Sequence, residues 1–247
     1  MINMAKDNNQ SYVPVVKGIP DFPFQYYTPT VDIKRKPYML VGMDSGIGNT
    51  AFSCITISDD KFANKIPVDF EYVDSFYFAD ELAKYSTTLD RQFFIVNKYW
   101  ELFSQENVES LTYELLPITN ISDPGTFKGV LHAQNTTALI NMVCRMIGHQ
   151  FYPTSPTEIK LCLTGNGFAS KEEMCKKAYE LTGDERLLTN DHMADAFADA
   201  FYGYIRKLKQ HIADRDGKGE IPQKWLDFCP WNFKTMPEPW YNKYIHN

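Results

Sequence analysis

The stretch Tyr38-Met39-Leu40-Val41-Gly42-Met43-Asp44 is a short apolar run that ends in an acid. Such a run, followed by turn-forming residues, predicts a buried β-strand. Asp44 is compatible with a simple turn role, because it precedes Ser45 and Gly46. We favour a functional role, because an unpaired buried carboxylate is costly and because Gly42 and Gly46 permit close backbone approach on either side.

The rest of the chain alternates strands and helices in an order typical of a mixed sheet. We expect strands at 50–57, 68–78 and 108–116 and from Phe151, a hairpin loop at 59–65, helices at 89–104 and 132–147, a helix opened by the capping box Ser170–Glu173 and ended near Gly183, and a last helix at 191–211. This order predicts an α/β fold whose five-stranded mixed sheet is a three-strand meander followed by β-α-β-α, with helices on both faces. The first and fourth strands can then be parallel neighbours, which brings Asp44 and Glu114 together at their carboxyl ends.

The composition predicts one packed domain with an extension at each end. The chain has 247 residues, of which 44% are hydrophobic and 15% aromatic, enough for one sizeable core. We expect an extended N-terminal arm at 1–37, a domain at 38–210 and a Trp/Pro-rich C-terminal extension at 211–247. No apolar run approaches the roughly 18 residues of a membrane span, and the first ten residues form no apolar signal segment, so we expect a cytoplasmic protein without membrane contact.

The cysteines and the net charge bound the chemistry. The five cysteines are widely spaced and form no C-x-x-C pair, which indicates free thiols and neither a zinc site nor a disulfide framework. A net charge of −6 is unusual for a nucleic-acid binder. It does not exclude one, because bound metal ions cancel carboxylate charge and the local field decides. Basic residues cluster at 34–36, at 206–209, and at Lys160 with Lys171, Lys176 and Lys177.

Three acids are placed as ligands of metal ions would be: Asp44, Glu114 and Asp195. Phosphodiester hydrolysis needs a positioned water and stabilisation of charge on the phosphoryl and leaving oxygens, which two Mg²⁺ ions about 4 Å apart supply. Carboxylates are natural ligands for Mg²⁺. Other interpretations stay open, because Glu114 is equally compatible with a surface acid on an edge strand. Asp195 lies opposite the apolar stripe of the last helix, where periodicity alone predicts a solvated face shared with Asp191 and Asp199.

Four blocks, in this order over residues 38–206, resemble the RuvC family of Holliday-junction resolvases. The most specific is Ile159-Lys160-Leu161-Cys162-Leu163-Thr164-Gly165-Asn166-Gly167-Phe168-Ala169-Ser170-Lys171, which is similar to that family's Val-Lys, its Thr-x-x-Gly-x-Gly-type turn and its Ala-x-Lys at a helix start. Val41 to Gly46 resembles the family's first strand and metal acid. Leu111 to Glu114 resembles its second acid, and Met193 to Ala198 its final Asp-Ala-Leu-Ala helix.

The resemblance implies an RNase H-like fold and a metal-dependent endonuclease, a crossover junction endodeoxyribonuclease. It implies that branched DNA, above all the four-way junction of DNA recombination and repair, is cut by paired nicks with two Mg²⁺ ions, for which Mn²⁺ substitutes. The long extensions suggest a divergent, phage-encoded version, acting in the cytoplasm of a bacterial or phage-infected cell. Because a four-way junction has two-fold symmetry, we expect a homodimer. Its candidate interface is the helix at 132–147, through Leu139, Met142, Val143 and Met146.

Further site residues follow from the resemblance alone. The family carries an Asp or His ligand three residues before its final aspartate, a position held here by His192, and residues at i and i+3 share one helix face. Asp191 is the substitute ligand, whereas we expect Asp199 at the surface. Lys160 and Lys171 are implied near the scissile phosphate, where they would stabilise transition-state charge. The resemblance implies a junction-wedging aromatic at Phe127, in the loop after Glu114, although a packing role is equally compatible with this residue. Lys128 and Lys176 are further candidate DNA contacts.

Competing interpretations remain from the sequence. Actin-like and sugar-kinase ATPases also begin with Asp-x-Gly and a nearby threonine, as in Asp44, Gly46 and Thr50, but they need a second domain of similar size. A catalytically silent junction binder, or a nuclease of the same fold that acts on other branched DNA or on RNA, also fits the same blocks.

Overall fold

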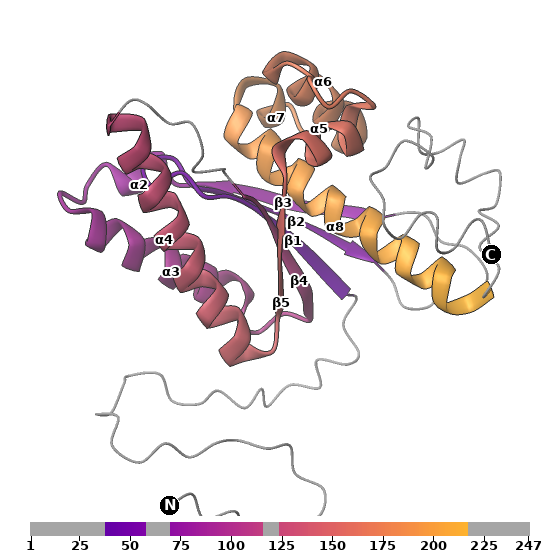
Figure 1. Ribbon diagram of the computed structural model, residues 1–247, viewed down its shortest axis with the longest axis horizontal. Coiled ribbons are helices and arrows are strands. Elements are labelled where there is room, and N and C mark those ends of the chain that lie inside the picture. Colours follow the sequence, from indigo (N-terminus) through magenta and orange to yellow (C-terminus); the bar gives the residue numbers. More distant parts are fainter. Residues whose placement is uncertain (1–37, 58–69, 116–123, 217–247) are drawn as a thin grey trace, which may run out of the picture.

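The computed structural model describes residues 38–57, 70–115 and 124–216 (Figure 1). The expected N-terminal arm, the expected loop at 59–65 and residues 217–247 of the expected C-terminal extension lie outside the described residues. The last helix continues to Asp216, past its predicted end at 211.

A five-stranded mixed sheet forms the centre of the described chain. β1 (Tyr38–Asp44), β2 (Ala51–Ile57) and β3 (Glu71–Tyr77) form an antiparallel meander. β4 (Val108–Glu114) runs parallel to β1, and β5 (Gln150–Thr154) runs parallel to β4, which gives the order β3-β2-β1-β4-β5. The predicted topology is confirmed. β4 has a neighbour on each side, so the interpretation of Glu114 as an edge-strand acid is wrong.

Helices cover both faces of the sheet (Figure 1). One face carries α2 (Ala79–Leu82), α3 (Thr88–Phe103) and α4 (Pro124–Ile147). The other carries α5 (Pro156–Thr164), α6 (Lys171–Thr182), α7 (Arg186–Thr189) and the long α8 (Asp191–Asp216). Within the described ranges, every helix is too short or too polar to cross a membrane.

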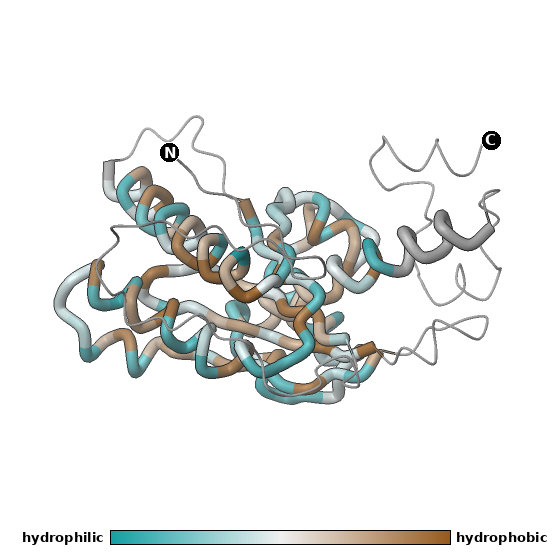
Figure 2. The backbone as a smooth tube through the Cα atoms, turned by 90° about the horizontal axis from the view of Figure 1, so that it is seen from below, coloured by the Kyte–Doolittle hydropathy of each residue, from teal (hydrophilic) through white to brown (hydrophobic). Residues whose placement is uncertain are grey.

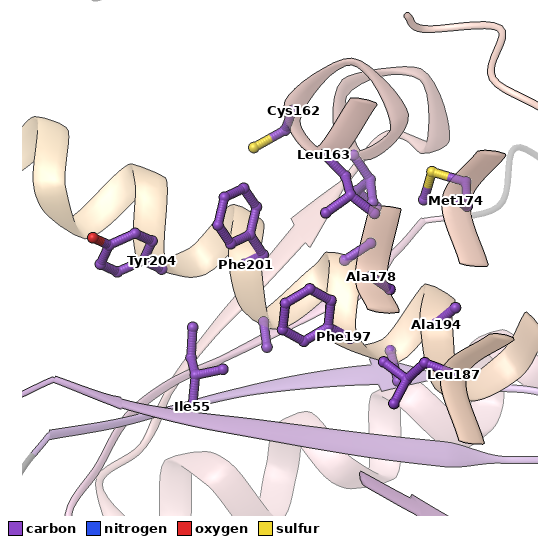
Figure 3. Close-up of a cluster of buried hydrophobic side chains, with 14 of the residues drawn as sticks. Ile55, Cys162, Leu163, Met174, Ala178, Leu187, Ala194, Phe197, Phe201 and Tyr204 are labelled. Carbon is purple, nitrogen blue, oxygen red and sulfur yellow. The ribbon is translucent and has the colours of Figure 1, made fainter. Parts of the chain in front are cut away.

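The two faces of the sheet bury two separate cores. Successive side chains of a strand point to opposite faces, so Leu40 joins the core under α8 while Val41 joins the core under α3 and α4. Hydrophobic and hydrophilic segments alternate along the chain, as expected for elements with one buried side (Figure 2). In the first core, Phe197 and Phe201 of α8 lie between Ile55 of the sheet and the α5–α6 layer above it (Figure 3). α8 is therefore sandwiched between the sheet and other helices.

Helix boundaries differ from the predictions in two places. α4 begins at Pro124, eight residues before the predicted start at His132, so Phe127 lies in a helix and not in a loop. The sequence analysis also missed α5. Its signals were present: Ser155 and Glu158 form a capping box around an N-terminal proline, and Gly165 caps the other end in the left-handed region at φ 80°.

The remaining helix signals behave as predicted. Ser170 and Glu173 form the capping box of α6, and Gly183 ends that helix at φ 75°. The Ser170 hydroxyl therefore accepts from the backbone N–H of Glu173 in the first turn of α6, which Lys171 begins.

Gly42 is a position at which the backbone of α8 lies directly on the backbone of β1. A Cβ atom added at Gly42 would lie 2.0 Å from the backbone oxygen of Ala196, 2.3 Å from the backbone nitrogen of Ala200 and 2.8 Å from the Cβ of Asp199. The backbones of β1 and α8 are thus in direct contact, which only glycine allows here. This contact sets how closely α8 brings its polar residues to the end of β1.

We expect Gly42→Ala to destabilise the protein by about 3 kcal/mol or more, because the added methyl group meets rigid backbone on both sides. The measurement is the free energy of unfolding from urea denaturation. Gly129→Ala is the matched control: it lies inside α4 with nothing within 4 Å of the added Cβ, so alanine should stabilise that helix by about 0.5–1 kcal/mol. Equal effects of the two substitutions would contradict the close contact at Gly42.

Candidate active site

Acids from β1, β4 and α8 meet at one edge of the sheet. The β1–β4 ladder pairs Met43 with Tyr113, so Asp44 and Glu114 end neighbouring parallel strands. The charges of Asp44 and Asp195 both act on Glu114, which places α8 over the same edge. The structure therefore brings together the three acids that the sequence singled out.

The acids repel one another in a poorly solvated place. Burial, followed by the charges of Asp195 and Asp44, raises the pKa of Glu114 to about 7. Burial and the charge of Asp44 raise the pKa of Asp195 to about 6. Both carboxyls thus hold their protons more tightly than a solvated acid does, because negative charge is poorly stabilised at this edge.

His192, in the first turn of α8, bridges two other elements. Its Nδ1 lies 2.6 Å from Asp44 Oδ2, and its Nε2 contacts the side-chain amide of Asn49. The ring stacks on Tyr77 of β3, with centroids 5.7 Å apart and planes 11° apart. If Asn49 donates to Nε2, the ring proton lies on Nδ1 and is donated to Asp44. The hydrogen bond to Asp44 raises the pKa of His192.

The two predicted lysines lie on the α5–α6 side of this edge. Lys171 contacts the carboxylate of Asp191, and that hydrogen bond raises the pKa of Lys171 while it lowers the pKa of Asp191. The positive charges of Lys160 and Lys171 both act on Glu114 and oppose the rise in its pKa. Positive charge therefore lies beside the acids.

Asp199 contradicts the prediction that it lies at the surface. It is 1% exposed, and its pKa is raised well above the ordinary value, by burial first and then by the charges of Glu114, Asp44 and Asp195. Asp195 also faces the sheet, so the side of α8 assigned to solvent points at the acidic edge. Periodicity failed here because α8 is covered on nearly every side and its polar residues line the site.

Other predicted residues are not brought to this edge by any described contact. Phe127 is 42% exposed in the first turns of α4, next to exposed Lys128, and Lys176 is exposed on α6. Only part of the predicted dimer interface on α4 is exposed. Val143 is buried and Leu139 packs partly into the core, whereas Met142 and Met146 are 51% and 47% exposed.

The sequence analysis missed Asn49 and Tyr77. Asn49 belongs to the turn after β1: Thr50 donates its hydroxyl to the Gly46 carbonyl, and a Cβ at Gly46 would meet Asn49 Oδ1 at 2.5 Å. Gly46 therefore gives Asn49 the room to reach His192. Tyr77 carried no recognisable signal, because only the sheet pairing places it beside α8.

The donors at this edge fit a divalent cation by their chemistry. Oxygen ligands with uncompensated negative charge suit Mg²⁺ or Mn²⁺, and Asp199 Oδ1 is buried and has no hydrogen bond to any described residue. In this conformation, no three His, Cys, Asp or Glu side chains of the described ranges close around a single point as ligands of one ion. His192 and Asp44 engage each other instead.

Comparison with known proteins identifies the fold. No family model and no curated protein matches the sequence. The structure of Thermus thermophilus RuvC matches with a TM-score of 0.54 at 16% identity, covering 69% of this chain and 96% of that chain. T. thermophilus RuvC in complex with a Holliday junction substrate matches with a TM-score of 0.53 at 18% identity, covering 68% and 94%.

The chain therefore has the RNase H-like α/β fold of the RuvC resolvase. The predicted resemblance to RuvC is confirmed at the level of the fold, and nearly the whole length of RuvC has a counterpart here.

We expect Glu114 to make the metal-free protein less stable as pH rises. Between its ordinary pKa of 4.5 and its folded pKa of about 7, the folded state binds the proton that the unfolded state has lost, so the free energy of unfolding falls across this window. Glu114→Gln removes this penalty. In EDTA, the stability difference between this variant and the wild type should grow by roughly 2 kcal/mol from pH 4.5 to 8.

The control for this measurement is Glu101→Gln, which changes an exposed glutamate paired with Lys98 on α3. Its stability difference from the wild type should stay nearly constant over the same window. If the difference in unfolding free energy between Glu114→Gln and the wild type did not change with pH, the pKa of the Glu114 carboxyl would not be raised by folding, and the prediction would be wrong.

Proposed function

We propose that this chain is a structure-selective endonuclease that resolves four-way DNA junctions by metal-dependent phosphodiester hydrolysis. The observation that carries the proposal is the meeting of Asp44, Glu114 and Asp195 at the carboxyl ends of adjacent parallel strands. The RuvC fold supports it, since T. thermophilus RuvC with this fold binds a Holliday junction substrate. The proposal includes paired nicks, one in each of two opposed strands.

Asp44, Glu114 and Asp195 would hold two Mg²⁺ ions, with His192 as the further ligand. Bound Mg²⁺ supplies an activated water and stabilises charge on the attacked and leaving oxygens. The carboxylates would position the ions, and the positive charge of the ions would relieve the repulsion that raises the pKa values of Glu114 and Asp195. Mn²⁺ should substitute, because imidazole and carboxylate together suit it.

His192 as a ligand requires a rearrangement of its partners. A ring nitrogen binds metal only through its lone pair, and in this conformation Nε2 contacts Asn49 while Nδ1 lies on Asp44. His192 would give up the contact with Asn49 and keep its ring plane against Tyr77. Asp191 is the weaker candidate, because Lys171 already neutralises it.

Lys160 and Lys171 would face the phosphate of the strand that is cut. Their charges already reach Glu114, so an anionic phosphate that occupies the same edge gains from both. Their role is to stabilise the negative charge that grows on the phosphoryl oxygens. DNA contacts by Phe127, Lys128 and Lys176 remain proposals that concern duplex arms further from the acids.

We expect Asp44→Asn, Glu114→Gln and Asp195→Asn each to abolish cutting of a labelled four-way junction in Mg²⁺ while leaving junction binding within a few-fold of wild type. Losing an ion ligand removes the chemistry, whereas contacts to the DNA backbone persist. Cleavage is followed on denaturing gels and binding by fluorescence anisotropy, with linear duplex and EDTA as negative controls. Turnover of ATP without DNA cleavage would instead favour the actin-like class.

Asp184→Asn is the matched control, because Asp184 is an aspartate committed to Arg186 and Tyr72 away from these acids; it should cut normally. Among the weaker ligands, His192→Ala should lose most activity and Asp191→Ala less. The reverse ranking would assign the further ligand to Asp191.

We propose that the protein acts as a homodimer, because two matched nicks across a two-fold junction need two related sites. Met142 and Met146 lie one turn apart on α4 and are about half exposed, which leaves an apolar strip that a second copy of α4 would cover.

In light scattering at micromolar concentration, we expect the wild type to have the mass of a dimer. The double variant Met142→Lys/Met146→Lys should have the mass of a monomer and an unchanged circular dichroism spectrum. Leu188→Lys, on α7 with 43% of its surface exposed, is the control that should leave the dimer intact. A monomeric wild type, with and without junction DNA, would contradict the dimer.

A further inference from the structure

Asp199 is a buried acid that the proposed chemistry has not used. It lies one helical turn beyond Asp195 on α8 and is 1% exposed. Its strongest charge interactions are with Glu114, Asp44 and Asp195. A carboxylate buried among carboxylates is a costly arrangement, so something must offset it.

Asp199 also holds the end of β4. The backbone N–H of Leu115 donates to Thr154 on the β5 side, so the N–H of Glu114 faces β1, because successive N–H groups of a strand point to opposite sides. The β1–β4 ladder ends at the pair Met43 and Tyr113. The N–H of Glu114 therefore lies past the ladder, and the carboxyl of Asp199 accepts its hydrogen bond.

One oxygen of Asp199 has no partner. Oδ1 is buried and makes no hydrogen bond within the described part of the chain, although buried polar atoms usually have one. The nearby charged groups named above are all negative. A divalent cation at this edge is the group that would compensate this oxygen, directly or through a bound water.

We infer that Asp199 is a positioning residue of the cation site: it fixes the backbone of Glu114 and adds a fourth carboxylate to the charge that draws the ions. The inference rests on the proposed cation-dependent nuclease. It assigns a role to a residue that belongs to none of the four sequence blocks.

The test is Asp199→Asn, which keeps the shape and an oxygen that can accept from Glu114 but removes the charge. Without metal, in EDTA, the variant should melt at a higher temperature than wild type, because burying an acid beside other acids costs free energy whether it keeps its charge or takes up a proton. Its affinity for Mn²⁺, measured by isothermal titration calorimetry, should fall roughly 10–100-fold, the usual effect of removing a group that supports metal ligands. A merely structural role would not produce these opposite changes.

Two further variants sharpen the result. Glu109→Gln neutralises an acid paired with Lys207 near the other end of β4 and should bind Mn²⁺ as wild type does. Asp199→Ser keeps a hydroxyl acceptor in a smaller side chain and should show the same loss of Mn²⁺ affinity if the Asn variant folds poorly.

Wild-type affinity for Mn²⁺ in both Asp199 variants, or no Mn²⁺ binding by the wild type, would overturn the inference. Junction cleavage is scored separately. A protein that shows the expected Asp199 effect on Mn²⁺ but cuts no junction would overturn the proposed function and leave the role of Asp199 standing.

Discussion

The contact between α8 and β1 at Gly42 is the constraint on which the site depends. A glycine in the middle of a buried strand lets the backbone of a long helix lie directly on the sheet, at Ala196 and Ala200. The acids Asp195 and Asp199 directly precede these two residues on α8, one helical turn apart, and they face the ends of β1 and β4. A side chain at position 42 would lift α8 and move these acids away from Asp44 and Glu114. Packing and chemistry are therefore set by the same residue.

The site collects negative charge that the fold alone does not neutralise. Glu114 and Asp195 have raised pKa values from burial and from the charges of nearby acids, Asp44 above all for Asp195, and Lys171 is engaged with Asp191. Hydrophobic burial around α8, from Phe197, Phe201 and their neighbours, supplies the stability that holds these groups together. Stored electrostatic strain of this kind is typical of functional sites, where a bound cation or substrate relieves it.

The sheet order was predictable because strands and helices alternate strongly along the chain, and Asp44 and Glu114 could be placed together from parallel strand ends alone. The burial of Asp199 could not be predicted in this way. Helical periodicity assumes that one face is solvated, whereas α8 is covered by the sheet on one side and by α5 and α6 on the other. Tyr77 and Asn49 reach His192 across long sequence separations, and no local pattern encodes such a contact. The failure to predict α5 has a different cause, because the capping box of Ser155 and Glu158 is a local signal that can be recognised in the sequence.

The contacts of His192 are compatible with a site in which this side chain exchanges a hydrogen-bond partner when a cation binds. Asp44 and His192 now satisfy each other, so two of the candidate ligands are occupied by a mutual hydrogen bond. Under the proposed function, a cation would displace Asn49 from Nε2 of His192, and its advantage would be the relief of repulsion among Glu114, Asp195 and Asp199. The ring of Tyr77 stacks on His192 and limits how the imidazole can turn. Asn49, on the turn that Gly46 permits, would then be the partner released.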